Sequence, residues 1–157
     1  MAVSTRPGWD EYFMDVAHTV KKRSTCLTRQ IGAVLVKDKR IMATGYNGSP
    51  AGIRHCNEGA CPRCSARMRG EVKSGVYPEN TPCICCHAEE NAIVQSALHG
   101  NSSKGATMYT TFTTCTNCAK MIINAGIRRV VAEQPYPDDV GTALLKEAGV
   151  EMVFFKR

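Results

Sequence analysis

Four residues in two short segments have the types and spacing of a metal-dependent hydrolytic site. His87 and Glu89 lie two positions apart, and Cys115 and Cys118 form a Cys-x-x-Cys pair further along the chain. One nitrogen and two sulfur ligands leave a bound zinc ion a fourth position for water, as in catalytic rather than structural zinc sites. Such a water becomes a nucleophile near neutral pH, and Glu89 is placed to carry its protons without binding the metal. These residues therefore predict a hydrolase with a catalytic zinc ion.

The sequence pattern places both segments at the starts of helices. Apolar spacing predicts a helix over residues 87–99, a strand over 107–112 and a second helix over 115–125. When helices follow adjacent parallel strands, their first residues lie at the same edge of the sheet. We therefore expect the histidine and the two cysteines to surround a single point.

The remaining pattern predicts an α/β fold. An amphipathic helix is followed by a hairpin with a polar turn at residues 37–40, and helices and strands alternate towards the end of the chain. These further elements are a helix over residues 9–23, strands over 31–36, 41–44, 128–132 and 150–155, and a helix over 138–148. The alternation implies βαβ crossovers and a largely parallel sheet that helices cover on both faces.

Length and composition favour one intracellular domain. The chain has 157 residues, of which 43% are hydrophobic, and we expect a single domain over residues 1–157. No stretch approaches the ~18 apolar residues of a membrane span, so we expect a soluble, cytoplasmic protein with no membrane partner. The formal charge of +6 falls to about +4 with a four-thiolate zinc site, and this charge suits an anionic small molecule.

A Cys-rich insertion at about residues 48–86 predicts a structural zinc site. The pattern of residues 45–82 predicts a loop, and a loop of this length is uncommon in a compact domain unless something orders it. In a reducing compartment, cysteines spaced in pairs favour metal over disulfides. The expected ligands are Cys61, Cys64, Cys83 and Cys85, with Cys26 and Cys56 as alternates or as part of a further site. We expect Cys86 to pack in the core.

Five segments resemble the cytidine deaminase superfamily and, within it, the deoxycytidylate (dCMP) deaminases. They are residues 24–26, 31–34, 44–50, 87–93 and 115–120. The signature of zinc deaminases is His-x-Glu followed by Pro-Cys-x-x-Cys. Thr114 stands in the place of the proline, and its hydroxyl could cap the same helix. The most discriminating segment is the Gly-Tyr-Asn-Gly-Ser-Pro loop, because tRNA-acting relatives usually differ there.

The resemblance implies a fold, a reaction and contacts with the substrate. The fold is a three-layer α/β/α sandwich with a five-stranded mixed sheet, and the reaction is hydrolysis of dCMP to dUMP and ammonia, which supplies thymidylate synthesis. Water would attack C4 of the cytosine ring while Glu89 protonates N3 and then the amine. Asn47 would contact the deoxyribose, backbone near Ala88 the base edge, and Tyr136 the nucleotide. Members commonly form homo-hexamers, and many respond to dCTP and dTTP.

Three other functions stay open. The same chemistry could act on a base in tRNA or single-stranded DNA, although Lys and Arg are scattered and the dense group at residues 21–23 ends a helix, where cations are favoured anyway. Deoxycytidine or dCTP could replace dCMP, since the sequence does not rank Arg54, Arg67 and Lys120 as phosphate ligands. A non-enzymatic zinc-binding module is the third alternative, but it would have no use for Glu89.

Overall fold

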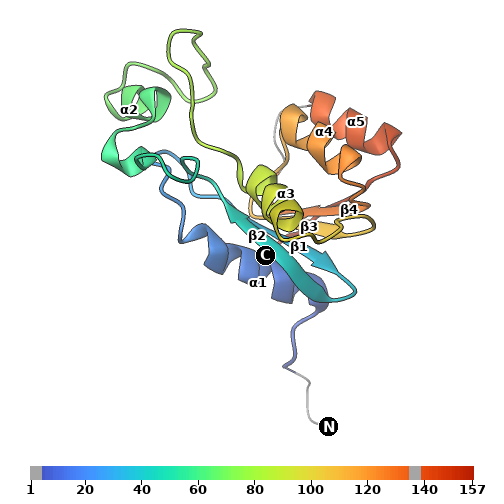
Figure 1. Ribbon diagram of the computed structural model, residues 1–157. Helices are drawn as coiled ribbons and strands as arrows, with labels where there is room; N and C mark the ends of the chain where they lie inside the picture. Colours follow the sequence, from blue (N-terminus) through green and yellow to red (C-terminus); the bar gives the residue numbers. More distant parts are fainter. Residues whose placement is uncertain (1–4, 135–138) are drawn as a thin grey trace.

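The computed structural model describes residues 5–134 and 139–157, which form three layers (Figure 1). A central sheet has helix α1 (Trp9–Lys21) on one face. Helices α3 (Ala88–Leu98), α4 (Thr116–Asn124) and α5 (Asp139–Glu147) cover the other face. The expected three-layer α/β/α sandwich is confirmed.

The sheet is mixed, and its strands follow the order β2-β1-β3-β4-β5. The strands are β1 (Gly32–Lys37), β2 (Arg40–Tyr46), β3 (Thr107–Thr110), β4 (Arg129–Ala132) and β5 (Glu151–Phe154). Strand β1 is antiparallel to both β2 and β3, whereas β3, β4 and β5 are parallel to one another. The five-stranded mixed sheet is confirmed. The expectation of a largely parallel sheet holds only for its second half, because the hairpin inserts β1 in the opposite direction.

Successive side chains of each strand point to opposite faces of the sheet, and this produces two separate cores. Val34 and Val36 of β1 pack with Phe13 and Met14 of α1 on one face. The neighbouring side chains of β1 point to the other face and pack with residues of α3 and α4. The members of this second core include Ala33, Leu35, Ala88, Ala92, Met108, Ala119 and Ile122. Because both faces of β1 are buried, its sequence is a continuous apolar run.

Strands β2 and β3 end at the same edge of the sheet. Each is antiparallel to β1, so the two run in the same direction. The chain that leaves β2 leads eventually to α3, and the chain that leaves β3 leads directly to α4. The first residues of both helices therefore lie at the carboxyl edge, where open α/β sheets bind ligands.

The insertion between β2 and α3 is more ordered than we expected. It contains a 3-10 helix, η1 (Cys56–Glu58), and a helix, α2 (Pro62–Met68), which projects from the sheet at the upper left of Figure 1. The prediction of a plain loop is therefore wrong for α2. Proline at the first helical position is a helix-start signal, but seven residues are too few to show helical periodicity.

The other predicted elements are confirmed with ends that shift by one or two residues. The hairpin turn is tighter than expected: Lys37 pairs with Arg40, and Asp38 and Lys39 alone form the turn, both with positive φ. No helix in residues 5–134 or 139–157 is long and apolar enough to cross a membrane.

Asp10 connects α1 to the sheet. Its carboxylate accepts two hydrogen bonds from Arg129 and one from the Tyr109 hydroxyl, each at 2.8 Å. The hydrogen bonds from Arg129 hold the pKa of Asp10 below its usual value of 3.8, despite partial burial. We predict that Asp10→Asn lowers the free energy of unfolding at pH 7 by about 2 kcal/mol, because hydrogen bonds to charged groups contribute about 1.5–3 kcal/mol.

The pH dependence of this loss has a definite sign. A carboxyl group whose pKa is lowered by folding stabilises the protein above its unfolded pKa, and the stabilisation is lost as the pH falls through the folded pKa. Urea unfolding should therefore show the difference between wild type and Asp10→Asn shrinking below pH 3.8. Asp15→Asn is the control, because Asp15 pairs with Arg157 at an exposed position and contributes little. Equal losses in the two variants would contradict this account.

Candidate functional site

Three predicted ligands meet where α3 and α4 begin. His87 is the residue before α3, Cys115 is the residue before α4, and Cys118 lies within the first turn of α4. The Nδ1 atom of His87 is 3.4 Å from the sulfur of each cysteine. In a tetrahedral zinc site, with bonds of about 2.0 Å to nitrogen and about 2.3 Å to sulfur, these atoms are about 3.5 Å apart. The three residues therefore fit a zinc ion without rearrangement.

Backbone contacts fix the position of His87. Gly48 and Cys86 form an antiparallel bridge with hydrogen bonds of 2.8 and 3.2 Å. The carboxylate of Glu90 accepts a hydrogen bond from the His87 N–H at 3.1 Å, and the Asn91 side chain donates to the last carbonyl of β2 at 2.8 Å. The start of α3 is thus attached to the sheet on both sides of the histidine.

Gly45 allows α3 to pack directly on β2. A Cβ atom at this position would lie 2.1 Å from the carbonyl oxygen of Ala88 and 2.5 Å from the nitrogen of Ala92. Both are backbone atoms, so the whole helix would have to move. We predict that Gly45→Ala lowers the free energy of unfolding by about 3 kcal/mol and weakens zinc binding at His87, as measured by urea unfolding and zinc titration.

Gly8→Ala is the matched control for this prediction. A Cβ atom at Gly8 meets no atom within 4 Å, so this variant should lose at most about 1 kcal/mol, the cost of alanine at the N-cap of α1. If Gly45→Ala matched Gly8→Ala in both stability and zinc affinity, the close approach of helix and strand would not position the site.

Glu89 is buried beside the three ligands. Its side chain is 3% exposed. The Thr110 hydroxyl donates a hydrogen bond to Oε1 at 2.7 Å, and Oε2 lies 3.9 Å from the sulfur of Cys118. Burial raises the pKa of Glu89, and the hydrogen bond from Thr110 opposes that rise. A carboxyl group with a raised pKa suits proton uptake and delivery near neutral pH.

The ligand side chains perturb each other's protonation. The neighbouring Cys118 thiol, together with His87, lowers the pKa of Cys115 to about 4. The hydrogen bond with Cys115 raises the pKa of His87 to about 9 despite burial. Thiolates and a neutral imidazole bind zinc, so metal binding at this site must release protons. The affinity of the site for zinc should therefore fall as the pH is lowered.

The structure gives Asn47 a role within the fold. Its Oδ1 atom accepts hydrogen bonds from the Ser24 hydroxyl at 2.7 Å and the Ile31 N–H at 2.8 Å, and its Nδ2 atom donates to the Arg29 carbonyl at 2.7 Å. The side chain thus fixes the loop between α1 and β1. The predicted sugar contact would have to use the second Nδ2 proton. Tyr136 lies outside the described residues.

Two smaller expectations come out differently, and the three phosphate candidates differ in their exposure. Cys115, not Thr114, precedes α4, and no side chain caps that helix, so the predicted capping by Thr114 is wrong. Cys86 lies half-buried outside the cores rather than within one. Among the candidate phosphate ligands, Arg54 and Lys120 are exposed, whereas Arg67 has two buried nitrogens without a hydrogen-bond partner in the described structure.

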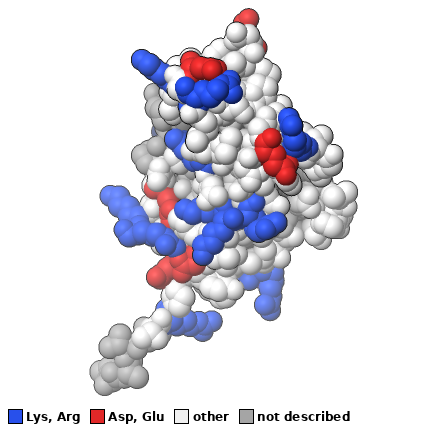
Figure 2. All heavy atoms as spheres, turned by 90° about the vertical axis from the view of Figure 1, so that its left-hand side faces the viewer, with Lys and Arg blue, Asp and Glu red and all other residues white. Residues whose placement is uncertain are grey.

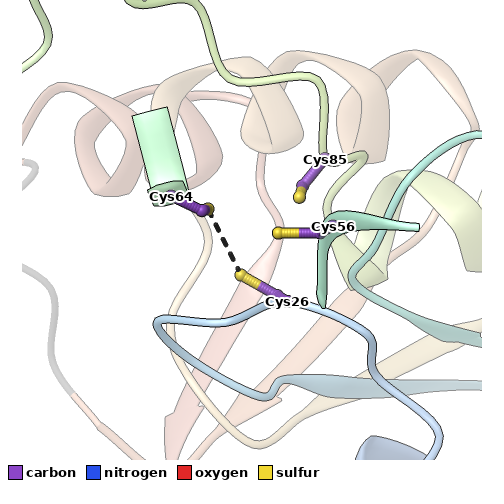
Figure 3. A group of neighbouring side chains, drawn as sticks. All are labelled: Cys26, Cys56, Cys64 and Cys85. Atoms are coloured by element: carbon purple, nitrogen blue, oxygen red, sulfur yellow. Dashed lines mark hydrogen bonds between the residues drawn. The ribbon is translucent and has the colours of Figure 1, made fainter. Parts of the chain in front are cut away.

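Six further cysteines form a second group, and Figure 3 shows four of them. They form two overlapping sets of four that share Cys64 and Cys85, and within each set all the sulfur atoms lie within 4.8 Å of one another. One set is Cys61, Cys64, Cys83 and Cys85; the other is Cys26, Cys56, Cys64 and Cys85. The four cysteines expected to bind structural zinc are thus brought together, and so are both alternates.

Sequence reasoning did not identify Thr110 or Asn91. Thr110 is the last residue of β3, and its hydroxyl orients Glu89. Asn91 attaches α3 to β2. A polar residue ending a buried strand at the carboxyl edge was an available signal for Thr110. No comparable signal distinguishes Asn91 from an ordinary helix-surface residue.

Comparison with known proteins gives consistent matches over most of the chain. The model of a family described as the cytidine and deoxycytidylate deaminase zinc-binding region matches residues 7–134. Deoxycytidylate deaminase of Schizosaccharomyces pombe is 43% identical over 150 residues, which are 94% of this chain and 44% of that protein. Deoxycytidylate deaminase of Mycobacterium phage D29 is 42% identical over 129 residues, 81% of this chain and 95% of that protein. The chain therefore spans less than half of the yeast relative's length.

A solved structure resembles the whole chain. The crystal structure of dCMP deaminase from the cyanophage S-TIM5, in complex with dCMP and dUMP, matches with a TM-score of 0.76 and 28% sequence identity. The match covers 97% of this chain and 100% of that chain. The fold that the sequence resemblance implies is confirmed, and the zinc-binding description of the matched family supports zinc as the cofactor.

Proposed function

The chain belongs to the family of cytidine and deoxycytidylate deaminases, and from that premise we propose that it hydrolyses dCMP to dUMP and ammonia. The observation that carries this proposal is the buried Glu89 carboxylate beside the His87, Cys115 and Cys118 cluster. This chain matches 95% of the length of the phage D29 deoxycytidylate deaminase, and that match supports dCMP as the substrate. The S-TIM5 structure with dCMP and dUMP supports it as well.

The geometry supports a separate role for each residue in metal binding, proton transfer or orientation. A zinc ion held by His87, Cys115 and Cys118 would supply a water whose pKa lies near 7, hence a nucleophile at about neutral pH. Glu89 would take the proton of this water through Oε2, the oxygen on the side of the cluster, and deliver protons to N3 and then to the departing amine. Thr110 holds Oε1 and so keeps the other oxygen turned towards the three ligands.

The proposed substrate contacts involve the sugar, the base and the phosphate of dCMP. The second Nδ2 proton of Asn47 would meet the deoxyribose, and backbone groups at Ala88 would meet the base edge, with Tyr136 near the nucleotide. Arg67 differs from the other two phosphate candidates because two of its nitrogens lack a hydrogen-bond partner in the described structure, but both are closed to solvent, so phosphate binding there would require its neighbours to move. If Arg67 binds the phosphate, Arg67→Lys should raise KM for dCMP more than KM for deoxycytidine.

The charge distribution favours a small nucleotide over a nucleic acid. Figure 2 shows several groups of Lys and Arg side chains over one face, the widest across its middle, with acidic side chains beside most of these groups. A nucleic-acid site would place cations in a continuous strip.

We also propose that the protein is a cytoplasmic homo-hexamer, as its family resemblance implies. The same resemblance implies that its product supplies thymidylate synthesis and that dCTP and dTTP regulate it. Light scattering with and without each effector tests the assembly.

A substrate panel tests the proposed reaction. Ammonia release is measured from dCMP, dCTP, deoxycytidine, CMP and a tRNA hairpin with the zinc-loaded protein. We expect turnover of dCMP, with kcat/KM on the order of 10⁴ M⁻¹s⁻¹ or more. Turnover of the hairpin alone would show that the protein deaminates a base within a nucleic acid. No turnover on any substrate would favour a zinc-binding module.

A further inference from the structure

We propose that six cysteines outside the active site hold two zinc ions in one cluster, with the sulfur atoms of Cys64 and Cys85 bridging the metals. Cys26 and Cys56 would complete the coordination of one ion, and Cys61 and Cys83 that of the other. This cluster is separate from the His87 site, and it makes the further site that the sequence left open part of one cluster with the predicted four-cysteine site.

The first support is that two tetrahedral sites overlap. Each set of four sulfur atoms is compact enough for one ion, and the two sets share Cys64 and Cys85. The sulfurs of Cys26 and Cys64 are 3.8 Å apart, and those of Cys61 and Cys83 are 3.7 Å apart. Two thiolates on one tetrahedral zinc, with bonds of about 2.3 Å, are about 3.8 Å apart. One pair of sulfur atoms in each set thus already has the spacing expected of two ligands on one zinc ion.

The orientation of the side chains agrees with this arrangement. Figure 3 shows the sulfur atoms of Cys26, Cys56, Cys64 and Cys85 pointing towards one another from four separate segments of the chain. Cys56 is fully buried and Cys64 is 2% exposed. The Thr28 hydroxyl lies 3.5 Å from the Cys26 sulfur and 3.8 Å from the Cys64 sulfur, where it can hydrogen-bond to thiolates.

Charge explains why the second ion would bind. One zinc ion with four thiolates carries a net charge of about −2. Adding a second ion together with the two remaining thiolates changes this charge by about zero, because +2 cancels −2. With one ion only, Cys26 and Cys56 would stay as unused thiols packed against a negatively charged site. The second ion uses both of them at no net cost in charge.

The cluster also supplies what this part of the fold lacks. Among the described residues, the hydrophobic group around α2 and η1 consists of the six cysteines with only Leu27 and Ile84 as larger apolar partners. So small an apolar group contributes little stability, and small lobes of this kind depend on metals or disulfides. Cys85 stands two residues before His87, so the cluster connects the insertion to the start of α3.

Native mass spectrometry of the reduced 157-residue chain tests the proposal. We expect three zinc ions per chain: two in the cluster and one at His87. Cys118→Ser, which removes only an active-site ligand, should retain two. Cys56→Ser should lose one of the cluster ions, and Cys86→Ser, a nearby thiol outside both sets, should retain all three. These counts do not depend on deamination, so they remain informative if the proposed function fails.

Two zinc ions in the wild type, whichever cysteines hold the second one, would overturn the proposal. So would bound iron, or disulfides among the six cysteines. Because the wild-type count decides the question by itself, a variant that fails to fold does not prevent the test. Cadmium-113 NMR then tests bridging: two cluster resonances coupled to each other are expected, and two uncoupled resonances would exclude shared sulfurs.

Discussion

Glu89→Gln should lower kcat for dCMP on the order of 10⁴-fold, the upper end of the range for general acid–base catalysis. Glutamine has nearly the same shape and can still accept the hydrogen bond from Thr110. It cannot take up a proton, and the proposed reaction asks Glu89 to move protons at more than one step. Steady-state ammonia release measures kcat, and native mass spectrometry should show unchanged zinc content.

Glu90→Gln is the matched control, since it makes the same chemical change at the next residue. The Glu90 carboxylate accepts a hydrogen bond from the His87 N–H, and a glutamine oxygen can do the same. We therefore expect kcat within a few-fold of wild type. If Glu89→Gln kept a tenth of the wild-type kcat while Glu90→Gln behaved similarly, Glu89 would not be the proton carrier.

The sequence predicted the order of elements well because most of them have strong local signals. The helix at residues 9–21 has a regular apolar face, and β1 is an uninterrupted apolar run. The direction of β1 relative to β3 depends on contacts between distant residues, and the alternation of later helices and strands suggested too many parallel pairs. Helix α2 was missed because its seven residues are ordered around cysteines rather than on an apolar core.

The candidate site was predictable only where residue type implies chemistry. His87, Cys115 and Cys118 are metal-binding residue types at helix starts, and the structure brings them together. Thr110 and Asn91 act by orienting other groups, and threonine or asparagine at those positions has many ordinary uses. Asn47 shows the converse, because the motif suggested a substrate contact while most of its hydrogen bonds hold the fold.

Cys118→Ser should abolish deamination and lower the zinc content by one ion per chain. Serine is not among the usual zinc ligands, and His87 with Cys115 alone would leave only two protein ligands. Without the metal, the attacking water would have a pKa of about 15.7 rather than about 7. The loss of kcat/KM should therefore equal or exceed that of Glu89→Gln. Ammonia release and metal analysis on the same sample measure both effects.

Cys86→Ser is the control for Cys118→Ser, because it removes a thiol near the site without removing a metal ligand. Cys86 stands next to His87, but its sulfur belongs to none of the metal-binding groups among the described residues, and its backbone pairs with Gly48 whatever the side chain. This variant should keep its zinc and its activity. Full activity in Cys118→Ser at reduced zinc content would show that the metal between α3 and α4 is not needed for the reaction. Because the cluster around α2 would retain its ions in that variant, such a result would concern the active site alone.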